Sequence, residues 1–263
     1  MLLDAIIIVL QESLEAGILI SLLLAIGNRW RHPLSWFYWG LAGGLGGSVL
    51  YAINLRHISE WFDYVGQEVL NASIQYAIYV CILILLWHLS TGRWRKSHSL
   101  LTTMSLIIVF AMVREGSEII VFYSGIIFSN GQLTTGLTSA FIGLTLGCSA
   151  GALCYYAVMA IAQNRAIGVQ FLLLSVIAAG MVGQATQLLI QADWLPQGGP
   201  LWDTSQILPE NSIPGQLAYA IVGYEATPTG VEVIFYCTAL LSTLLLFFKS
   251  RHSLKRATPQ EPQ

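Results

Sequence analysis

The chain has 263 residues, of which 55% are hydrophobic and only 10% are charged, and its mean hydropathy is +0.66. A soluble domain carries about 25% charged residues, so this composition excludes an ordinary soluble enzyme, a nucleic-acid-binding protein and a disordered scaffold. The formal net charge of −2 adds little. We therefore expect an all-α integral membrane protein whose main surroundings are the lipid bilayer.

Apolar runs bounded by polar clusters predict seven transmembrane helices of about 20 residues or more. In chain order they are Leu2–Ile26, Trp36–Leu55, Leu70–Leu89, Leu100–Phe128, Thr135–Ala162, Val169–Ala192 and Val231–Phe248. A proline-rich outer loop, 193–230, precedes the seventh helix, and a cytoplasmic tail, 249–263, follows it. No linker is visible, so residues 1–263 are expected to form one transmembrane domain.

The distribution of basic residues predicts the orientation, because cytoplasmic loops are enriched in Lys and Arg. Ten of the twelve Lys and Arg residues lie in the first, third and fifth connections and in the tail. The N-terminus is then outside the cell and the C-terminus is in the cytoplasm. The outer side collects most of the acidic residues. These either raise the local cation concentration or simply complement the positive inner side.

Five ionisable residues remain near the middle of predicted spans: Glu12 and Glu15 in the first, and Arg114, Glu115 and Glu118 in the fourth. A charge at the bilayer centre costs about 2.5–3.5 kcal/mol on insertion scales. One ion pair would explain one or two such residues, but not four carboxylates in matched positions. The sequence therefore predicts a functional site here.

The two groups of charges have the same spacing. Gln11-Glu12-Ser13-Leu14-Glu15 and Arg114-Glu115-Gly116-Ser117-Glu118 are two copies of [Q/R]-E-x-x-E, and residues three apart share one face of a helix. With three spans in each half, the two copies run in opposite directions through the membrane. This arrangement predicts a three-plus-three inverted repeat, about 1–90 and 100–192, with a binding site at the midplane and a seventh helix added.

Glycines give a second indication of the repeat. The second span contains the glycine-rich run 40–47, and the fifth span has Gly143, Gly147 and Gly151 at four-residue spacing. These two spans correspond to each other in a three-plus-three repeat. Small residues at this spacing let helix backbones approach closely.

A cluster of carboxylates without a nearby thiol or imidazole selects hard cations. Fe³⁺, Mn²⁺, Ca²⁺ and Mg²⁺ all fit such a site, and the cluster could also carry protons. Arg114 would offset part of the negative charge when no ion is bound. Because carboxylates must be ionised to bind a metal, we expect metal binding to displace protons.

Four acidic residues on the outer side are candidates for an entry path: Glu225, Glu232, Glu60 and Asp63. Glu232 begins the seventh helix close to Glu225, and Glu60 and Asp63 precede the third. Each could be an entry ligand or a solvated acid, and the sequence leaves both interpretations open.

Other classes of seven-helix membrane protein fit less well. A retinal pigment needs a lysine deep in a helix, but Lys96, Lys249 and Lys255 lie at or beyond helix ends. An intramembrane protease would show H-E-x-x-H, paired aspartates or a Ser/His pair in the membrane. We therefore expect a transporter and not an enzyme.

The motifs resemble those of the oxidase-dependent high-affinity iron permeases, a family that includes bacterial ferrous-iron uptake permeases. The mark of that family is R-E-x-x-E in spans one and four. Here the second copy is intact, and Gln11 replaces the arginine in the first. The resemblance extends through 178–184 to the outer-loop segments 201–205 and 223–228, and so covers nearly the whole chain.

The resemblance implies inward iron transport, with iron (Fe³⁺ or Fe²⁺) as the substrate and Glu12, Glu15, Glu115 and Glu118 as its ligands, and no permanently bound cofactor. It implies a plasma or inner membrane location and a separate extracytoplasmic ferroxidase or iron-delivery protein as partner. Gln11 makes the empty site more negative by one charge. A permease of the same architecture for another metal, manganese or lead, remains the alternative.

Overall fold

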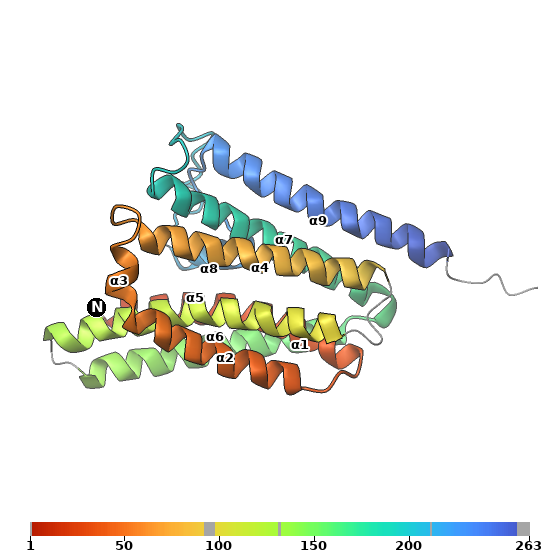
Figure 1. The fold of residues 1–263 in the computed structure, drawn as a ribbon, viewed down its shortest axis with the longest axis horizontal. Helices are drawn as coiled ribbons and strands as arrows, with labels where there is room; N and C mark the ends of the chain where they lie inside the picture. Colours follow the sequence, from red (N-terminus) through yellow and green to blue (C-terminus); the bar gives the residue numbers. More distant parts are fainter. Residues whose placement is uncertain (1, 92–97, 131–132, 211, 257–263) are drawn as a thin grey trace, which may run out of the picture.

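Long helices dominate the computed structural model, which describes residues 2–91, 98–130, 133–210 and 212–256. Seven of them run side by side (Figure 1): α1 (Leu2–Arg29), α2 (Ser35–Ile53), α4 (Gly66–Ser90), α5 (His98–Asn130), α6 (Leu133–Ala160), α7 (Gln163–Gln191) and α9 (Gly230–Arg256). Two short helices, α3 (Leu55–Ser59) and α8 (Ile213–Val222), lie in connections. The described part contains no β-strand, which confirms the all-α prediction.

Five of the described helices are long and apolar enough to cross a membrane, namely α1, α4, α6, α7 and α9. This supports a multi-pass membrane protein. The other two long helices, α2 and α5, are less apolar because of their composition. Glycine, tryptophan and tyrosine lower the hydropathy of α2, and α5 contains Arg114, Glu115 and Glu118. That these two also span the membrane remains a prediction.

Two features of the connections differ from the sequence-based expectation. The loop 193–230 contains the apolar helix α8, which begins with a Ser212 side-chain cap on the Gly215 N–H. Ten residues are too few to be recognised as a span. The last helix also continues to Arg256, well into the expected tail, because a helix can extend past the bilayer when basic residues favour its C-terminal end. Residues 257–263 lie outside the described part.

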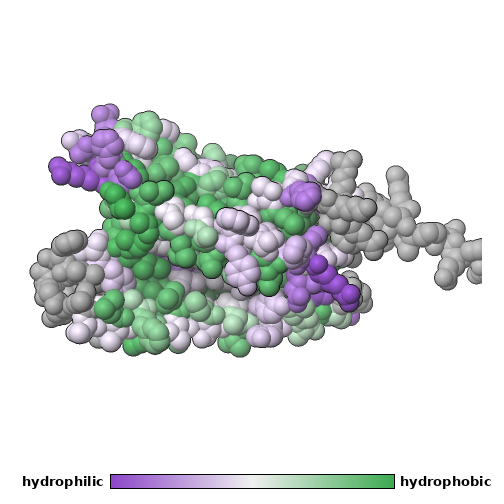
Figure 2. Space-filling model, turned by 60° about the horizontal axis from the view of Figure 1, so that its bottom comes forward, coloured by the Kyte–Doolittle hydropathy of each residue, from purple (hydrophilic) through white to green (hydrophobic). Residues whose placement is uncertain are grey.

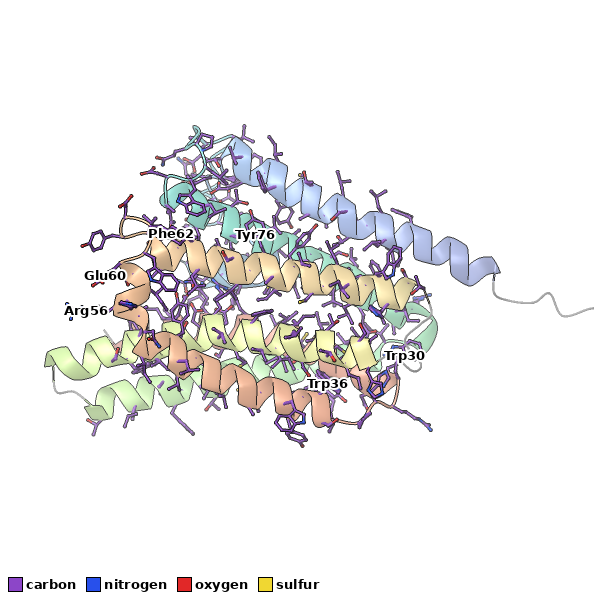
Figure 3. All side chains as sticks on the ribbon, viewed as in Figure 1. Trp30, Trp36, Arg56, Glu60, Phe62 and Tyr76 are labelled. Carbon is purple, nitrogen blue, oxygen red and sulfur yellow. The ribbon has the colours of Figure 1, made fainter. Side chains whose placement is uncertain are left out.

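The surface has the pattern of a bundle in lipid. Figure 2 shows hydrophobic side chains over the middle of the face in view and hydrophilic residues gathered towards its two ends. Figure 3 places Arg56, Glu60 and Phe62 at one end of the bundle, and Trp30 and Trp36 at the other. Aromatic side chains at both ends suit two water–lipid interfaces. The buried core between them is contributed mainly by α1, α4, α5 and α7.

The closest helix pairs cross between the two halves of the chain: α1 packs against α6, and α2 packs against α5. In the first pair, the Ser13 hydroxyl on α1 donates to Val9 O at 2.6 Å and lies 3.4 Å from Gly143 O on α6. In the second pair, the Ser48 hydroxyl on α2 donates to Gly44 O at 2.8 Å and to Met112 O on α5 at 2.5 Å.

A glycine faces each of these serines. A methyl group on Gly147 of α6 would lie 2.7 Å from Ser13 Cβ, and one on Gly116 of α5 would lie 3.1 Å from Ser48 Cβ. Neither position has room for a side chain unless the helices move apart. Glycine at 147 therefore sets the distance between α1 and α6, and glycine at 116 sets the distance between α2 and α5.

We expect Gly147→Ala to destabilise the protein by about 1–3 kcal/mol, because overpacking a tight contact forces neighbours to shift. Thermal unfolding in detergent measures the change. Gly125→Ala on α5 is the matched control, since nothing lies within 4 Å of its added methyl group. The control should be neutral or slightly stabilising, because alanine favours a helix interior over glycine. Equal melting temperatures for both variants would contradict the packing argument.

Candidate functional site

The two charged motifs meet in the interior of the bundle. Glu12 and Glu15 lie on α1 and Glu115 on α5, and the exposed fractions of these residues are 7%, 6% and 2%. The three-residue spacing turns both carboxylates of each motif to one side of its helix, and the contact between α1 and α5 brings the two sides together. Glu118 is the most open member, with 37% of its side chain exposed.

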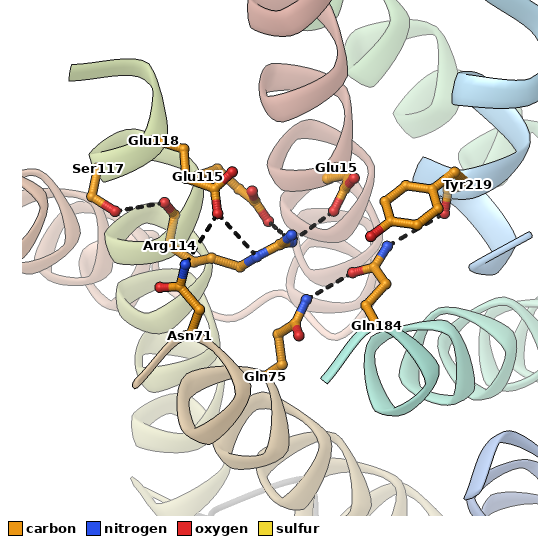
Figure 4. A network of polar contacts seen from close by, with 9 residues as sticks. All are labelled: Glu15, Asn71, Gln75, Arg114, Glu115, Ser117, Glu118, Gln184 and Tyr219. Carbon is orange, nitrogen blue, oxygen red and sulfur yellow. Dashed lines mark hydrogen bonds and ion pairs between the residues drawn. The ribbon is translucent and has the colours of Figure 1, made fainter. Parts of the chain in front are cut away.

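Arg114 is the centre of this carboxylate cluster (Figure 4). Its Nη1 donates to Glu15 Oε2 at 2.8 Å and to Glu115 Oε1 at 2.6 Å, and its Nε lies 3.8 Å from Glu118 Oε1. Glu12 shares a hydrogen bond with Glu115. The guanidinium is itself buried, so one cation supplied by the chain neutralises part of a cluster drawn from both motifs.

Several carboxylate oxygens in the cluster have no partner. Glu12 Oε2, Glu15 Oε1 and Glu115 Oε2 are each buried and accept no hydrogen bond. A buried polar atom left without a partner costs about 1–3 kcal/mol, and more when it is charged. A site with three such oxygens gains free energy when a proton or a metal ion enters.

Within the described ranges, no three His, Cys, Asp or Glu side chains are arranged to hold a metal ion. The network around Arg114 explains this, because the guanidinium lies where the carboxylates of α1 and α5 converge. An incoming cation would replace it as the partner of Glu15 and Glu115. The guanidinium thus holds oxygens of Glu15 and Glu115 that would otherwise be open to another cation.

The helix α4 adds polar partners that sequence reasoning missed. Asn71 Nδ2 donates to Glu118 Oε1 at 3.3 Å, and Asn71 Oδ1 accepts from the Tyr51 hydroxyl at 2.9 Å. The signal was present in the sequence, since Asn71 and Gln75 lie one turn apart in a predicted transmembrane helix. Contacts with other helices were needed to identify their partners.

A second polar chain lies beside the cluster. Gln75 Nε2 on α4 donates to Gln184 Oε1 on α7 at 2.7 Å, and Gln184 Nε2 lies 3.5 Å from the Tyr219 carbonyl on α8. Figure 4 shows Gln184 and Tyr219 next to Glu15. This chain joins three helices close to the carboxylates.

The four outer candidates are divided between two places. Glu225 and Glu232 line one cavity of about 380 Å³ between α7, α8 and α9. Glu60 is exposed and pairs with Arg56 at 3.8 Å, and Asp63 is exposed in the connection between α3 and α4 with a positive φ of 62°. The structure therefore brings only Glu225 and Glu232 together.

Glu225 and Glu232 share a hydrogen bond beside this cavity. Burial, together with the charges of Glu232 and Glu210, raises the pKa of Glu225 to about 8. Glu232 also accepts from the Thr229 N–H and hydroxyl through Oε2, at 2.6 and 2.9 Å. Glu225 is therefore protonated more readily than an ordinary glutamate.

The raised pKa of Glu225 predicts a loss of stability above neutral pH. A carboxyl group whose pKa rises from 4.5 to about 8 on folding favours the folded state at low pH. That contribution falls progressively above pH 4.5 and is lost as pH rises through 8. Melting temperatures of the wild type should therefore fall between pH 6 and 9 by more than those of Glu225→Gln. Glu60→Gln, at an exposed site, should keep the wild-type slope; parallel curves for all three would contradict the assignment.

Gln11, the neutral counterpart of Arg114, is half-buried one residue before Glu12. The two motifs thus contribute one arginine and four carboxylates.

No solved structure and no curated protein matched the chain in our comparisons. A family model does match, over residues 2–254, and it describes permeases, which are transporters rather than enzymes. The chain belongs to the iron permease FTR1 family.

Proposed function

We propose that the protein carries iron inward across the cell membrane and that Glu12, Glu15, Glu115 and Glu118 bind the ion on its way. Family membership supports iron as the substrate. The observation that carries the proposed site is the set of three buried carboxylate oxygens without partners around one guanidinium. Oxygen ligands of this kind suit iron and other hard cations.

The transport step in this proposal uses Arg114 as a tethered counter-ion. In the empty site Arg114 pairs with Glu15 and Glu115. An entering ion takes over these carboxylates, which replace part of its water shell. When the ion leaves towards the cytoplasm, the guanidinium returns, so the carboxylates are never left together without a cation.

The halves of the chain are proposed to move against each other as inverted repeats. Aligning the two motifs pairs Val9 with Met112, and aligning the glycine-rich helices pairs Gly143 with Gly44. At each of the two helix crossings, α1 with α6 and α2 with α5, a serine hydroxyl lies between these two equivalent carbonyls. Ser13 supplies it from the motif helix α1 at the first crossing, and Ser48 supplies it from the glycine-rich helix α2 at the second. This matching contact supports a common ancestral unit in opposite orientations.

The remaining elements of the proposal concern the surroundings. All seven long helices span the plasma or inner membrane, with the N-terminus outside. A separate extracytoplasmic ferroxidase or delivery protein presents the iron. The N-terminal side of α1, α3 and the connection between α7 and α9 lie at one end of the bundle (Figure 1), which groups the outer acidic residues at the end where iron would arrive.

Uptake of radioactive iron into proteoliposomes that hold the purified protein tests the function. Fe²⁺ and Fe³⁺ are presented separately, with Mn²⁺ and Pb²⁺ as competitors. We expect saturable iron uptake that Mn²⁺ or Pb²⁺ at the same concentration as the iron reduces only weakly. Strong competition, together with direct uptake of either competitor, would favour the alternative of a permease for another metal.

A further inference from the structure

The cavity beside Glu225 and Glu232 leads towards the carboxylate cluster. This outer chamber is lined by residues of α7, α8, α9 and the adjoining connections, including Gln184, Gln187, Gly223 and Cys237. A second, much smaller space of about 10 Å³ lies next to Glu15 and Ile18. Gln184 and Gly223 line both spaces. They therefore form the wall that separates the chamber from the cluster.

The small space next to Glu15 has the character of a narrow cation passage. Glu15 lines it and has one buried oxygen, Oε1, without a hydrogen-bond partner. The C-terminal end of α8 lines it too, through Ala220 and Ile221, and the C-terminus of a helix carries partial negative charge. Because about 10–15 Å³ is needed for one water, the space is too small for a hydrated ion in this conformation.

Gln184 is held in this wall by contacts with two other helices. Its side chain accepts from Gln75 on α4 at 2.7 Å, and its Nε2 lies 3.5 Å from the Tyr219 carbonyl on α8. The Gln184 side chain is buried. Gln187 lies one turn away on α7 and lines only the outer chamber.

We propose that ions enter from the outer chamber and reach Glu15 past Gln184, whose contacts with Gln75 and Tyr219 hold the passage shut between transport events. Gln184 is a positioning residue in this scheme. It separates the outer chamber from Glu15 and does not bind the ion. This inference rests on the proposed function, because it takes Glu15 as part of the ion path.

The test measures access to the small space without using iron. Ile18→Cys is introduced as a reporter into the full-length chain whose four native cysteines are replaced by alanine. The protein is placed in lipid nanodiscs, and the labelling rate with the small cationic reagent 2-aminoethyl methanethiosulfonate is followed by mass spectrometry. We expect slow labelling when Gln184 is present and at least tenfold faster labelling with Gln184→Ala. Gln187→Ala is the matched control and should leave the rate unchanged.

A second variant covers the case in which Gln184→Ala does not fold. Gln75→Leu removes the α4 contact but leaves the wall residue in place, and labelling should become at least threefold faster. The proposal is overturned if a folded Gln184→Ala labels no faster than Gln187→Ala, or if a folded Gln75→Leu labels at the parent rate. Iron uptake is measured separately: faster labelling in a protein that does not transport iron would refute the proposed function and leave the route intact.

Discussion

Replacing Glu115 by glutamine should lower the rate of iron uptake by at least about tenfold, because changing even the hydrogen-bond partners of metal ligands typically costs about 10–100-fold. Glutamine keeps the shape of the side chain but removes the negative charge that a hard cation requires. Glu115 is the most deeply buried of the four carboxylates. Glu12→Gln, in the other motif, should have a similar effect. Initial rates of radioactive iron uptake into proteoliposomes measure both.

The control for these variants is Glu60→Gln, which removes one carboxylate at an exposed position on the outer side. Its uptake rate should stay within about twofold of the wild type, because surface charges act weakly. If Glu115→Gln and Glu12→Gln transported iron at the control rate while folding normally, the carboxylate cluster would not lie on the ion path.

Arg114→Gln should destabilise the protein by about 3–5 kcal/mol, the usual cost of removing one partner from a buried ion pair. The substitution leaves Glu15 and Glu115 without the cation that now bridges them. A metal ion should restore part of the stability, because binding to the folded state alone contributes about 2.7 kcal/mol at 100 times Kd. Thermal unfolding in detergent with and without Mn²⁺, which is soluble and resists oxidation, measures both effects.

Arg56→Gln is the matched control for this prediction. Arg56 also contacts a glutamate, Glu60, but 96% of its side chain is exposed. Its removal should leave the melting temperature unchanged with or without Mn²⁺. An Arg114→Gln protein as stable as the wild type, or one that Mn²⁺ does not stabilise, would argue against Arg114 as a counter-ion that a metal replaces.

The sequence was sufficient to predict the long helices and to identify the charged residues within them. Long apolar runs predicted the seven long helices with ends that differ from the observed ones by a few residues in most cases, because burial in lipid requires a continuous apolar segment. α8 was missed, since ten apolar residues among prolines carry no such requirement. The end of α9 was placed too early because a helix need not stop at the membrane surface.

For the candidate site too, the sequence was sufficient to recognise the charged residues but not to predict their contacts. The cost of charge in lipid is a local property, so Glu12, Glu15, Arg114, Glu115 and Glu118 could be recognised from the sequence alone. Which oxygens Arg114 holds, and which remain without a partner, depends on how α1 and α5 cross. No spacing rule within one helix predicts a contact between two helices.

The sequence by itself determined the composition class, the long helices and the two charged motifs, because each depends on neighbours within about one helical turn. Only the tertiary structure decided that Arg114 lies among the carboxylates and that Glu225 and Glu232 share a chamber while Glu60 and Asp63 do not. It also decided that Gln184 separates this chamber from Glu15. Several of these relations join residues far apart in the chain, such as Arg114 and Glu15, and their physical cause is the packing of whole helices against one another.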